Sequence, residues 1–358
     1  MTRVAPPIDR RSLARRLAVL FGTPTSALVT LGMLALVAWV VPKLYDWAVA
    51  QATFSGADRK ACGEAGACWV FIRIRMHELM YGGYPPGESY RPDLCALVLV
   101  ALIIAAAWPR NPRRFEGLVA LLLIYPLAAV LFLRGGFAGL PTVETRLWGG
   151  LLLNFVLSFI AIVVSLPLGL LLAEGRRSSQ PEIAAFCIGF IEIWRAAPIV
   201  TILFFGIVIL PLMLPRGVDF NKFGCVAVAL TLFSSAYMAE AIRGGLQALP
   251  RGQYEAAIAL NLRPWQGRLL VVWPQALRLS IPAIVTIGID LFKDTSLVTI
   301  VGLFDVLGAL QQAIKDPQWL GLAAEGYLFV AAIFLVICSL LSLLARRLER
   351  QLSVERRD

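Results

Sequence analysis

Ionisable side chains inside long apolar runs are the residues of this sequence that could do chemistry. Glu192 and Arg195 lie three residues apart in one such run, and Lys293 and Asp294 stand at the end of another. A charge in apolar surroundings is costly unless it is paired or faces water. Because residues three apart share a helical face, we predict a structural ion pair between Glu192 and Arg195 and prefer it to a role in a polar pathway.

A second polar set lies on the apolar run 222–242. Hydroxyl and carboxylate groups suit the ammonium and carboxylate groups of an amino acid, and hydrogen bonding between helices is an equally good interpretation. By their spacing, Ser234, Tyr237 and Met238 could share one face. With those of the later run, the candidates for a substrate pathway are Ser234, Ser235, Tyr237, Met238, Glu240, Lys293, Asp294 and Thr295.

Two of these groups have a purely structural alternative. Glu240 stands near the end of its run and could simply pair with Arg243. Asp290, Lys293 and Asp294 fall within one helical turn, so a satisfied charge cluster at a helix end competes with an outer gate.

The sequence lacks the patterns of nucleotide-binding and metal-dependent enzymes. It has neither G-x-x-x-x-G-K-[ST] nor G-x-G-x-x-G, and the single histidine, His77, cannot build a His-rich metal site. We therefore expect no metal, no cofactor and no catalysis on this chain. Cys62 and Cys68 could form a disulfide in an oxidising periplasm, and two free thiols are an equally good interpretation.

The elements that must position these residues are membrane helices. Fifty-nine per cent of the 358 residues are hydrophobic and 16% are charged, whereas soluble domains average about a quarter charged. One aqueous core cannot hide that much apolar surface. The net charge of +10 would point to nucleic acid in a soluble protein. Here the basic residues lie mostly between apolar runs, so topology explains the charge and we expect no nucleic-acid partner.

A span needs about 20 mostly apolar residues. We predict eight spans, of which Pro198 should bend or break the fifth: 25–42, 93–108, 117–134, 147–173, 184–213, 222–242, 270–292 and 321–345. The distribution of Lys and Arg between them places both termini in the cytoplasm.

The predicted cytoplasmic loop 243–269 contains a short helical run, Tyr254 to Leu262. Pro250 and Gly252 break the preceding helix, and Pro264 ends the run. The run carries Glu-Ala-Ala at 255–257, where two small residues beside an acid would let the helix pack into a groove on another protein. The residues alone do not separate this interpretation from a plain surface helix.

This loop resembles the EAA loop of binding-protein-dependent ABC import permeases. The Glu255-Ala256-Ala257 triplet is present, and the Val-Val-Trp-Pro stretch that ends at Pro274 matches the end of the family pattern. Asn261 stands where that family has glycine. Asn tolerates the left-handed backbone that glycine provides at a helix end.

Other segments resemble the permeases of polar amino acid importers and together cover about 147–345: residues 191–198, 233–245, 273–278 and 292–297. The front part is similar to the longer permeases of general L-amino acid importers, which carry three extra N-terminal spans. The segments that carry this second likeness are 67–69, 84–85 and 140–150.

The resemblance implies an all-α integral membrane protein with a type I ABC importer permease core, in a bacterial inner membrane. It implies a second permease subunit, an ABC ATPase dimer that binds ATP and Mg²⁺, and a periplasmic amino-acid-binding protein. Glu255 would be the polar contact to the ATPase, and Ala256 and Ala257 the close-packing ones. The predicted regions are an N-terminal tail (1–24), an appended membrane module (25–146) with a periplasmic loop (43–92), a permease core (147–345) with a coupling loop (243–269), and a C-terminal tail (346–358).

Three alternatives stay open beside an L-amino acid importer. The substrates could be opines or other cationic nitrogen compounds. A secondary transporter would require inverted repeats and discontinuous helices in matching halves, which the sequence does not show. A structural membrane anchor would explain the loop but not the polar residues on several spans.

Overall fold

The structure is a computed structural model, and it describes residues 20–63, 65–107, 117, 120–213, 215 and 221–354. In these ranges every regular element is a helix, and β pairing is limited to three isolated bridges. The chain divides into two compact units, residues 1–74 and 75–358. The predicted N-terminal tail lies almost wholly outside the described residues, as does the end of the C-terminal tail.

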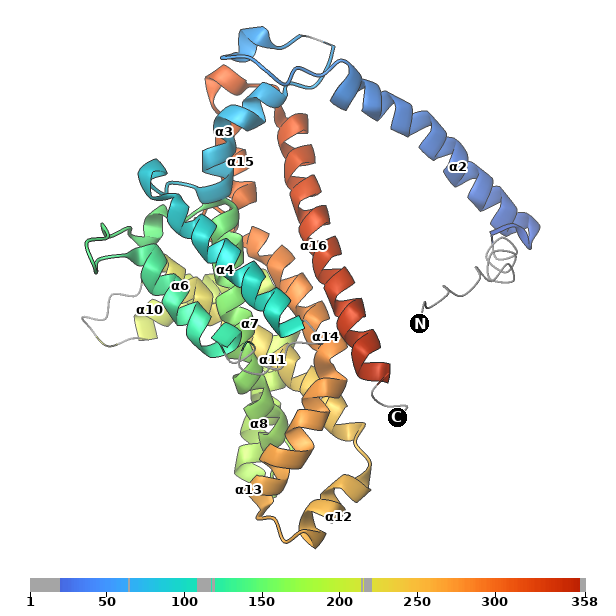
Figure 1. The fold of residues 1–358 in the computed structure, drawn as a ribbon, viewed down its shortest axis with the longest axis vertical. Helices are drawn as coiled ribbons and strands as arrows, with labels where there is room; N and C mark the ends of the chain where they lie inside the picture. Colours follow the sequence, from blue (N-terminus) through green and yellow to red (C-terminus); the bar gives the residue numbers. More distant parts are fainter. Residues whose placement is uncertain are drawn as a thin grey trace, which may run out of the picture. The chain divides into compact units, whose positions relative to one another are not determined.

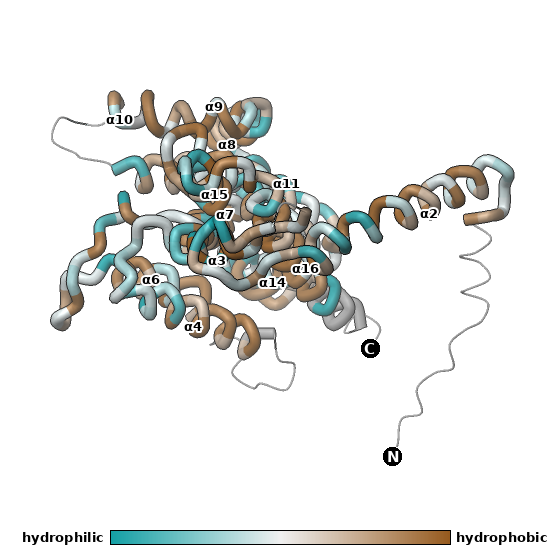
Figure 2. The backbone as a smooth tube through the Cα atoms, turned by 90° about the horizontal axis from the view of Figure 1, so that it is seen from above, coloured by the Kyte–Doolittle hydropathy of each residue, from teal (hydrophilic) through white to brown (hydrophobic). Residues whose placement is uncertain are grey.

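The first unit consists of a long apolar helix and a cross-linked loop. Helix α2 (Pro24–Tyr45) begins where Thr23 Oγ1 accepts the Ser26 N–H at 3.1 Å, and it continues into a π-helical turn, η1 (Asp46–Ala50). Most of its residues are apolar (Figure 2), and none of them is buried. That exposure is what a helix in lipid requires.

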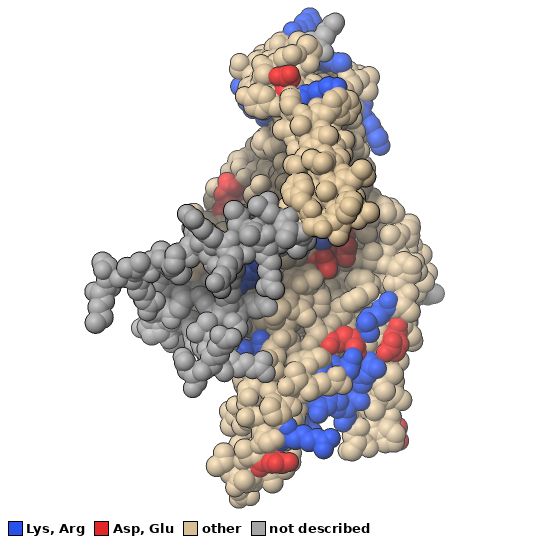
Figure 3. All heavy atoms as spheres, turned by 90° about the vertical axis from the view of Figure 1, so that its right-hand side faces the viewer, with Lys and Arg blue, Asp and Glu red and all other residues tan. Residues whose placement is uncertain are grey.

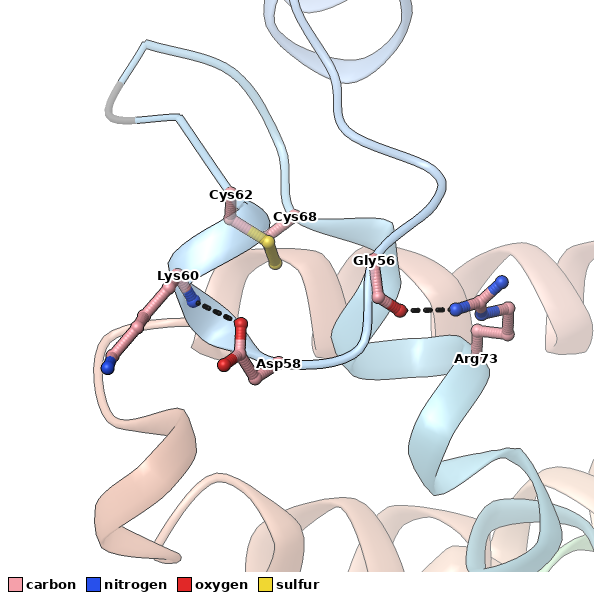
Figure 4. Close-up of a disulfide and its surroundings, with 6 residues drawn as sticks. All are labelled: Gly56, Asp58, Lys60, Cys62, Cys68 and Arg73. Carbon is pink, nitrogen blue, oxygen red and sulfur yellow. Dashed lines mark hydrogen bonds between the residues drawn. A yellow bond between two sulfur atoms is a disulfide. The ribbon is translucent and has the colours of Figure 1, made fainter.

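In the loop that follows, Cys62 and Cys68 are joined by a disulfide, with their Cα atoms 5.5 Å apart. Figure 4 shows the bond beside two local hydrogen bonds, from the Lys60 N–H to Asp58 Oδ1 and from the Arg73 guanidinium to the Gly56 carbonyl oxygen. The segment between them is the short helix η2 (Arg59–Ala61). Helix α3 (Trp69–Tyr81) comes next and contains the boundary between the units.

The second unit is a bundle of long helices with short helices at its ends (Figure 1). Its main elements in chain order are α4 (Tyr90–Ala107), η4 (Ala120–Ile124), α6 (Tyr125–Arg134), α7 (Gly150–Gly175), α8 (Pro181–Ala196), α9 (Ile199–Phe204), η6 (Phe205–Ile209), α10 (Leu210–Met213), α11 (Lys222–Gln247), α12 (Arg251–Ala259), α13 (Pro264–Gly267), η7 (Arg268–Val272), α14 (Trp273–Asp294), η8 (Thr295–Val301), α15 (Val306–Ala313) and α16 (Ala323–Val354). Short 3₁₀ turns connect several of them: η3 (Pro86–Glu88), η5 (Thr145–Leu147) and η9 (Pro317–Trp319).

Among the described residues, five helices are long and apolar enough to cross a membrane: Pro24–Ala50, Gly150–Gly175, Lys222–Gln247, Pro264–Val301 and Ala323–Arg347. A sixth is counted if α8 and the segment Ile199–Met213, bent by 109°, form one broken span. The predicted break at Pro198 is confirmed, because its backbone is extended between α8 and α9. The other two predicted spans correspond to α4 and to the shorter apolar helix Ala120–Arg134, so the count of eight stays a prediction.

The division of the structure differs from the predicted boundary at residue 146. One buried apolar cluster contains Cys95 of α4 and Leu133 of α6 together with Leu152 and Leu157 of α7. Because α4 and α6 share this core with the first helix of the predicted permease core, residues 75–146 belong to the same compact unit as that core, whereas α2 belongs to the first unit.

Glycines let α11 approach its neighbours closely. A Cβ atom on Gly169 of α7 would lie 2.6 Å from the Cβ of Met238, and one on Gly245 of α11 would overlap Ser280 Oγ and the Ala276 carbonyl oxygen of α14. Backbone approach of this kind is the usual role of small residues between membrane helices.

We therefore expect Gly245→Ala to destabilise the protein and Gly244→Ala, its neighbour on α11, to stabilise it slightly. A Cβ atom at Gly244 meets nothing within 4 Å, so that variant gains helix propensity of about 0.5–1 kcal/mol. The overpacked Gly245 variant loses about 1–3 kcal/mol. Thermal unfolding of the two purified variants measures both effects, and shifts of the same sign would contradict the close contact.

Candidate functional site

A short surface helix, α12, joins the spans α11 and α14 at one end of the second unit (Figure 1). It begins at Arg251, three residues before the predicted run, because Pro250 sets an extended backbone and starts a new helix. Gly252 lies inside the helix and does not break it.

The end of α12 is set by Asn261, which has a left-handed backbone with φ +54°. The Asn261 N–H donates to the Ile258 carbonyl oxygen at 2.8 Å, and the Leu262 N–H donates to that of Ala257 at 3.2 Å. These two hydrogen bonds form a Schellman motif, a helix end in which the left-handed residue is usually glycine. The left-handed conformation predicted for Asn261 is confirmed.

The two alanines of the Glu-Ala-Ala triplet face different ways. Glu255 and Ala256 are exposed, whereas Ala257 is buried and packs toward Gly267 of α13, where a Cβ atom would lie 3.2 Å from its own. Both alanines were predicted to contact the ATPase. In the structure only Ala256 is exposed and free to make such a contact. Ile258 and Leu260 are 75% and 71% exposed, so α12 presents a carboxylate beside apolar side chains.

Side-chain contacts connect α12 to the spans. Gln275 Nε2 of α14 donates to Gln253 Oε1 at 2.9 Å, and Arg177 Nη1, just after α7, donates to Tyr254 Oη at 3.3 Å. Pro274 is the second residue of α14, which directly follows the π-helical segment η7. These contacts link α12 to α14 and to the segment that follows α7.

Charged residues of three helices meet near the same end of the unit. Glu240 of α11 contacts Arg176 at 2.8 Å, Arg243 at 2.7 Å and Arg195 at 3.7 Å, and Arg176 also contacts Glu192 at 3.1 Å. We call these five residues the Glu240 cluster. Figure 3 shows Lys and Arg side chains gathered with acidic ones on the lower part of the face that it displays.

The structure corrects the predicted Glu192–Arg195 ion pair. Both residues belong to the Glu240 cluster, but Glu192 contacts Arg176 and Arg195 contacts Glu240. The reason is that α7 and α11 bring opposite charges to the same place, which spacing along α8 alone cannot reveal. The predicted alternative for Glu240, an ion pair with Arg243, is present as one of three contacts that Glu240 makes with arginines.

The hydroxyls predicted on the α11 face are buried within this chain. Ser234 and Ser235 are buried and donate to the carbonyl oxygens of Leu230 and Leu232 at 2.7 Å, and Met238 is buried against α7. Both hydroxyls therefore donate to carbonyl oxygens of their own helix. Tyr237 lies on another side of α11, half-buried, with its ring 5.7 Å from the Arg195 guanidinium.

At the far end of α14, Lys293 pairs with Asp290 at 2.8 Å, in agreement with the alternative of a satisfied charge cluster. Both side chains are more than half exposed. Asp294 is half-buried, and Thr295 is completely buried and belongs to a different polar group.

That group is a buried network which the sequence analysis missed. Asn154 Nδ2 of α7 donates to Asp305 Oδ2 at 3.0 Å and to Thr295 Oγ1 at 2.9 Å, and its Oδ1 accepts the Val306 N–H at 3.1 Å. Asp305 Oδ1 accepts the Thr299 hydroxyl at 2.6 Å and the Gly308 N–H at 3.0 Å. The network fixes η8 and α15 to the start of α7. The only signal in the sequence was a single Asn in the apolar run 151–173.

Asp305 is buried in this network. Burial raises the pKa of its carboxyl group, and the hydrogen bonds from Thr299, Gly308 and Asn154 oppose that rise. A buried carboxylate with three donors is the acceptor that holds the network together.

These features define a class of protein: an all-helical, multi-pass membrane protein that carries a short exposed helix, tied to its spans, at one end. Within the described residues, no group of His, Cys, Asp and Glu side chains is arranged to hold a metal ion.

Residues 165–354 match the family described as the binding-protein-dependent transport system inner membrane component, and the chain belongs to that family. It is 44% identical over 337 residues to the inner membrane amino-acid ABC transporter permease protein YhdY of Escherichia coli strain K12, covering 94% of this chain and 92% of YhdY. It is 35% identical over 407 residues to the glutamate/glutamine/aspartate/asparagine transport system permease protein BztC of Rhodobacter capsulatus, covering 94% and 93%.

A solved structure described as an amino acid ABC transporter with histidines aligns with a TM-score of 0.50 and 29% identity, over 56% of this chain and 92% of that chain. The predicted class, an all-α membrane permease of the ABC importer family, is thereby confirmed.

Proposed function

We propose that this chain forms half of the translocation pathway of an ABC importer for L-amino acids and couples that pathway to ATP hydrolysis through α12. The observation that carries the coupling role is the outward surface of α12. Exposed Glu255 and Ala256, with the apolar side chains of Ile258 and Leu260 beside them, match a docking helix for another protein. The hydrogen bonds of Gln253 and Tyr254 to the spans would carry the movement inward.

The chain itself would hydrolyse nothing. ATP and Mg²⁺ would bind to a separate ATPase dimer, and closure of that dimer would push α12 and move the helices between inward-open and outward-open states. The inner side of α12 supports this transmission, because Ala257 packs against Gly267 at the start of the next span.

The remaining partners in the proposal are a second permease subunit and a periplasmic amino-acid-binding protein. A paralogous second permease is supported by the matches of this chain to both BztC and BztB of Rhodobacter capsulatus, each described as a permease protein of the same transport system. The names of the relatives mention glutamate, glutamine, aspartate, asparagine and arginine. They favour L-amino acids over the alternative substrates, opines or other cationic nitrogen compounds.

The predicted pathway residues remain candidates in this proposal. The side chains of Tyr237, Lys293 and Asp294 are not buried, whereas Ser234, Ser235, Met238 and Thr295 are buried within this chain. Glu240 is paired with Arg176 and Arg243 at the end of the second unit near α12, so any contribution of Glu240 to the pathway would involve these arginines.

Uptake into proteoliposomes tests the proposal. The chain would be reconstituted with its partner permease and ATPase, with ATP inside the vesicles and the binding protein and labelled L-amino acids outside. We expect uptake that requires both ATP and the binding protein. Uptake that follows an ion gradient without ATP would overturn the proposal in favour of a secondary transporter, and transport of opines alone would overturn the substrate class.

A further inference from the structure

A cavity of about 190 Å³ lies between α4, α6 and α7, on the side of the second unit away from α12. Figure 1 shows these three helices beside one another. The walls are formed mainly by aliphatic and aromatic side chains, among them Leu99, Val130, Leu152 and Phe159. None of these residues belongs to the coupling helix or to the Glu240 cluster.

The polar groups in the wall are largely occupied by the protein itself. Tyr125 Oη donates to the Cys95 carbonyl oxygen at 2.9 Å, and Tyr81 Oη donates to Asp93. Buried water needs two to four polar partners, and an apolar cavity of about 150 Å³ stays dry and accepts hydrocarbon. By size and lining, this cavity is suited to hydrocarbon.

The depth of the cavity matches one leaflet of a bilayer. On α7 its lining runs from Leu151 to Ile160, and on α4 from Pro92 to Val100. At 1.5 Å per residue these stretches measure about 14 Å and about 12 Å, roughly half of a hydrocarbon core of about 30 Å. The cavity begins near the first turn of α7, which the predicted topology places at the periplasmic face.

The cavity is open at the surface of the second unit. Val100 and Phe155 both line it, and their side chains are 54% and 38% exposed. An acyl chain from the same leaflet could therefore enter sideways between α4 and α7.

The charge at the shallow end is negative. Asp93 lines the cavity there and is exposed. Burial and the hydrogen bond to Asp93 raise the pKa of Tyr81 to about 12, so the phenol remains a donor that supports the carboxylate. Arg91 cannot neutralise the site, because its side chain is fully buried, pairs with Glu88 at 2.7 Å and donates to the Pro141 carbonyl oxygen.

We propose that this cavity is a lipid site, which holds one acyl chain of a phospholipid whose head group carries an amine, with the ammonium beside Asp93. Phosphatidylethanolamine has this chemistry, whereas an anionic phospholipid would place like charges together. A bound lipid would fill the space between the appended helices and the first helix of the predicted permease core.

The first test uses the assembled importer, purified in mild detergent, and measures retained phospholipid by native mass spectrometry. We expect one phosphatidylethanolamine per copy of this chain. Ala129→Phe, on a residue that lines the cavity, should abolish retention, and Ala128→Phe, its exposed neighbour on α6, should not. Equal retention by the two variants would overturn the site.

A second measurement on the unaltered chain keeps the proposal testable if Ala129→Phe fails to assemble. Cys95 lines the cavity, and peptide mapping separates its reaction with N-ethylmaleimide from that of the other free cysteines. After delipidation, phosphatidylethanolamine at about ten times its dissociation constant should slow this reaction about tenfold, since only the empty fraction reacts.

The two parts of the proposal fail separately in this second measurement. Equal protection of Cys95 by phosphatidylglycerol with the same acyl chains would overturn the head-group assignment. Absence of protection by either lipid would overturn the site itself. Asp93→Asn should abolish the preference for the amine while preserving protection.

Discussion

Replacing Glu255 by Lys is expected to reduce ATP-driven uptake to background without changing the amount of this chain in the membrane. Glu255 is exposed on α12, so its replacement leaves the packing of the chain intact. At the proposed interface the change removes one charge and introduces the opposite one. Loss of an interfacial charge pair costs about 2–5 kcal/mol, which corresponds to a decrease in affinity of roughly 30-fold to several thousand-fold.

The measurement is uptake by reconstituted vesicles, with binding of the ATPase subunit measured in parallel. Glu182→Lys is the matched control, because Glu182 is an exposed acid in the first turn of α8, near the same end of the unit. It should transport normally. Normal uptake by the Glu255→Lys importer would refute the coupling role of α12. Equally weak binding of the ATPase by Glu255→Lys and Glu182→Lys would refute it as well.

Asp305→Ala is expected to have the largest effect on stability. It removes the acceptor for Asn154 Nδ2, the Thr299 hydroxyl and the Gly308 N–H, all at a completely buried position. Each stranded donor costs about 1–3 kcal/mol, so three of them should cost about 3–9 kcal/mol. We expect η8 and α15 to detach from α7 and the protein to unfold at a markedly lower temperature.

Thermal unfolding of purified protein measures this loss. Asp290→Ala is the control, because Asp290 forms only an exposed pair with Lys293, worth no more than about 1 kcal/mol. A double exchange adds a sharper test. Asp305→Asn and Asn154→Asp should each destabilise the protein, and their combination should recover part of the loss by reversing the donor and the acceptor. Additive losses would show that the two side chains do not interact.

Features that depend on neighbouring residues could be predicted from the sequence. The apolar runs identified α7, α11, α14 and α16, and Pro198 identified the break between α8 and α9. The left-handed Asn261 followed from the known tolerance of Asn for that backbone. Family membership followed from short motifs, because such motifs retain their spacing.

Features that depend on contacts between distant segments could not be predicted. The partners of Glu192 and Arg195 come from other helices, so local spacing paired them incorrectly. Asn154 and Asp305 are far apart in sequence and meet only after α15 has folded back onto α7. The inward orientation of Ala257 could not be predicted either, because it depends on the packing of α12 against Gly267.

The π-helical segment η7 (Arg268–Val272) lies between α12 and α14, where the insertion or deletion of one residue would reorient α12. A π-helical turn holds one residue more than an α-helical one. An α-helix rotates by about 100° per residue. Deleting a single residue from η7 would therefore restore an ordinary helix and swing everything before it, α12 included, by more than a quarter turn about the axis of α14. During divergence, one inserted or deleted codon here could re-aim the α12 surface without altering any residue on it.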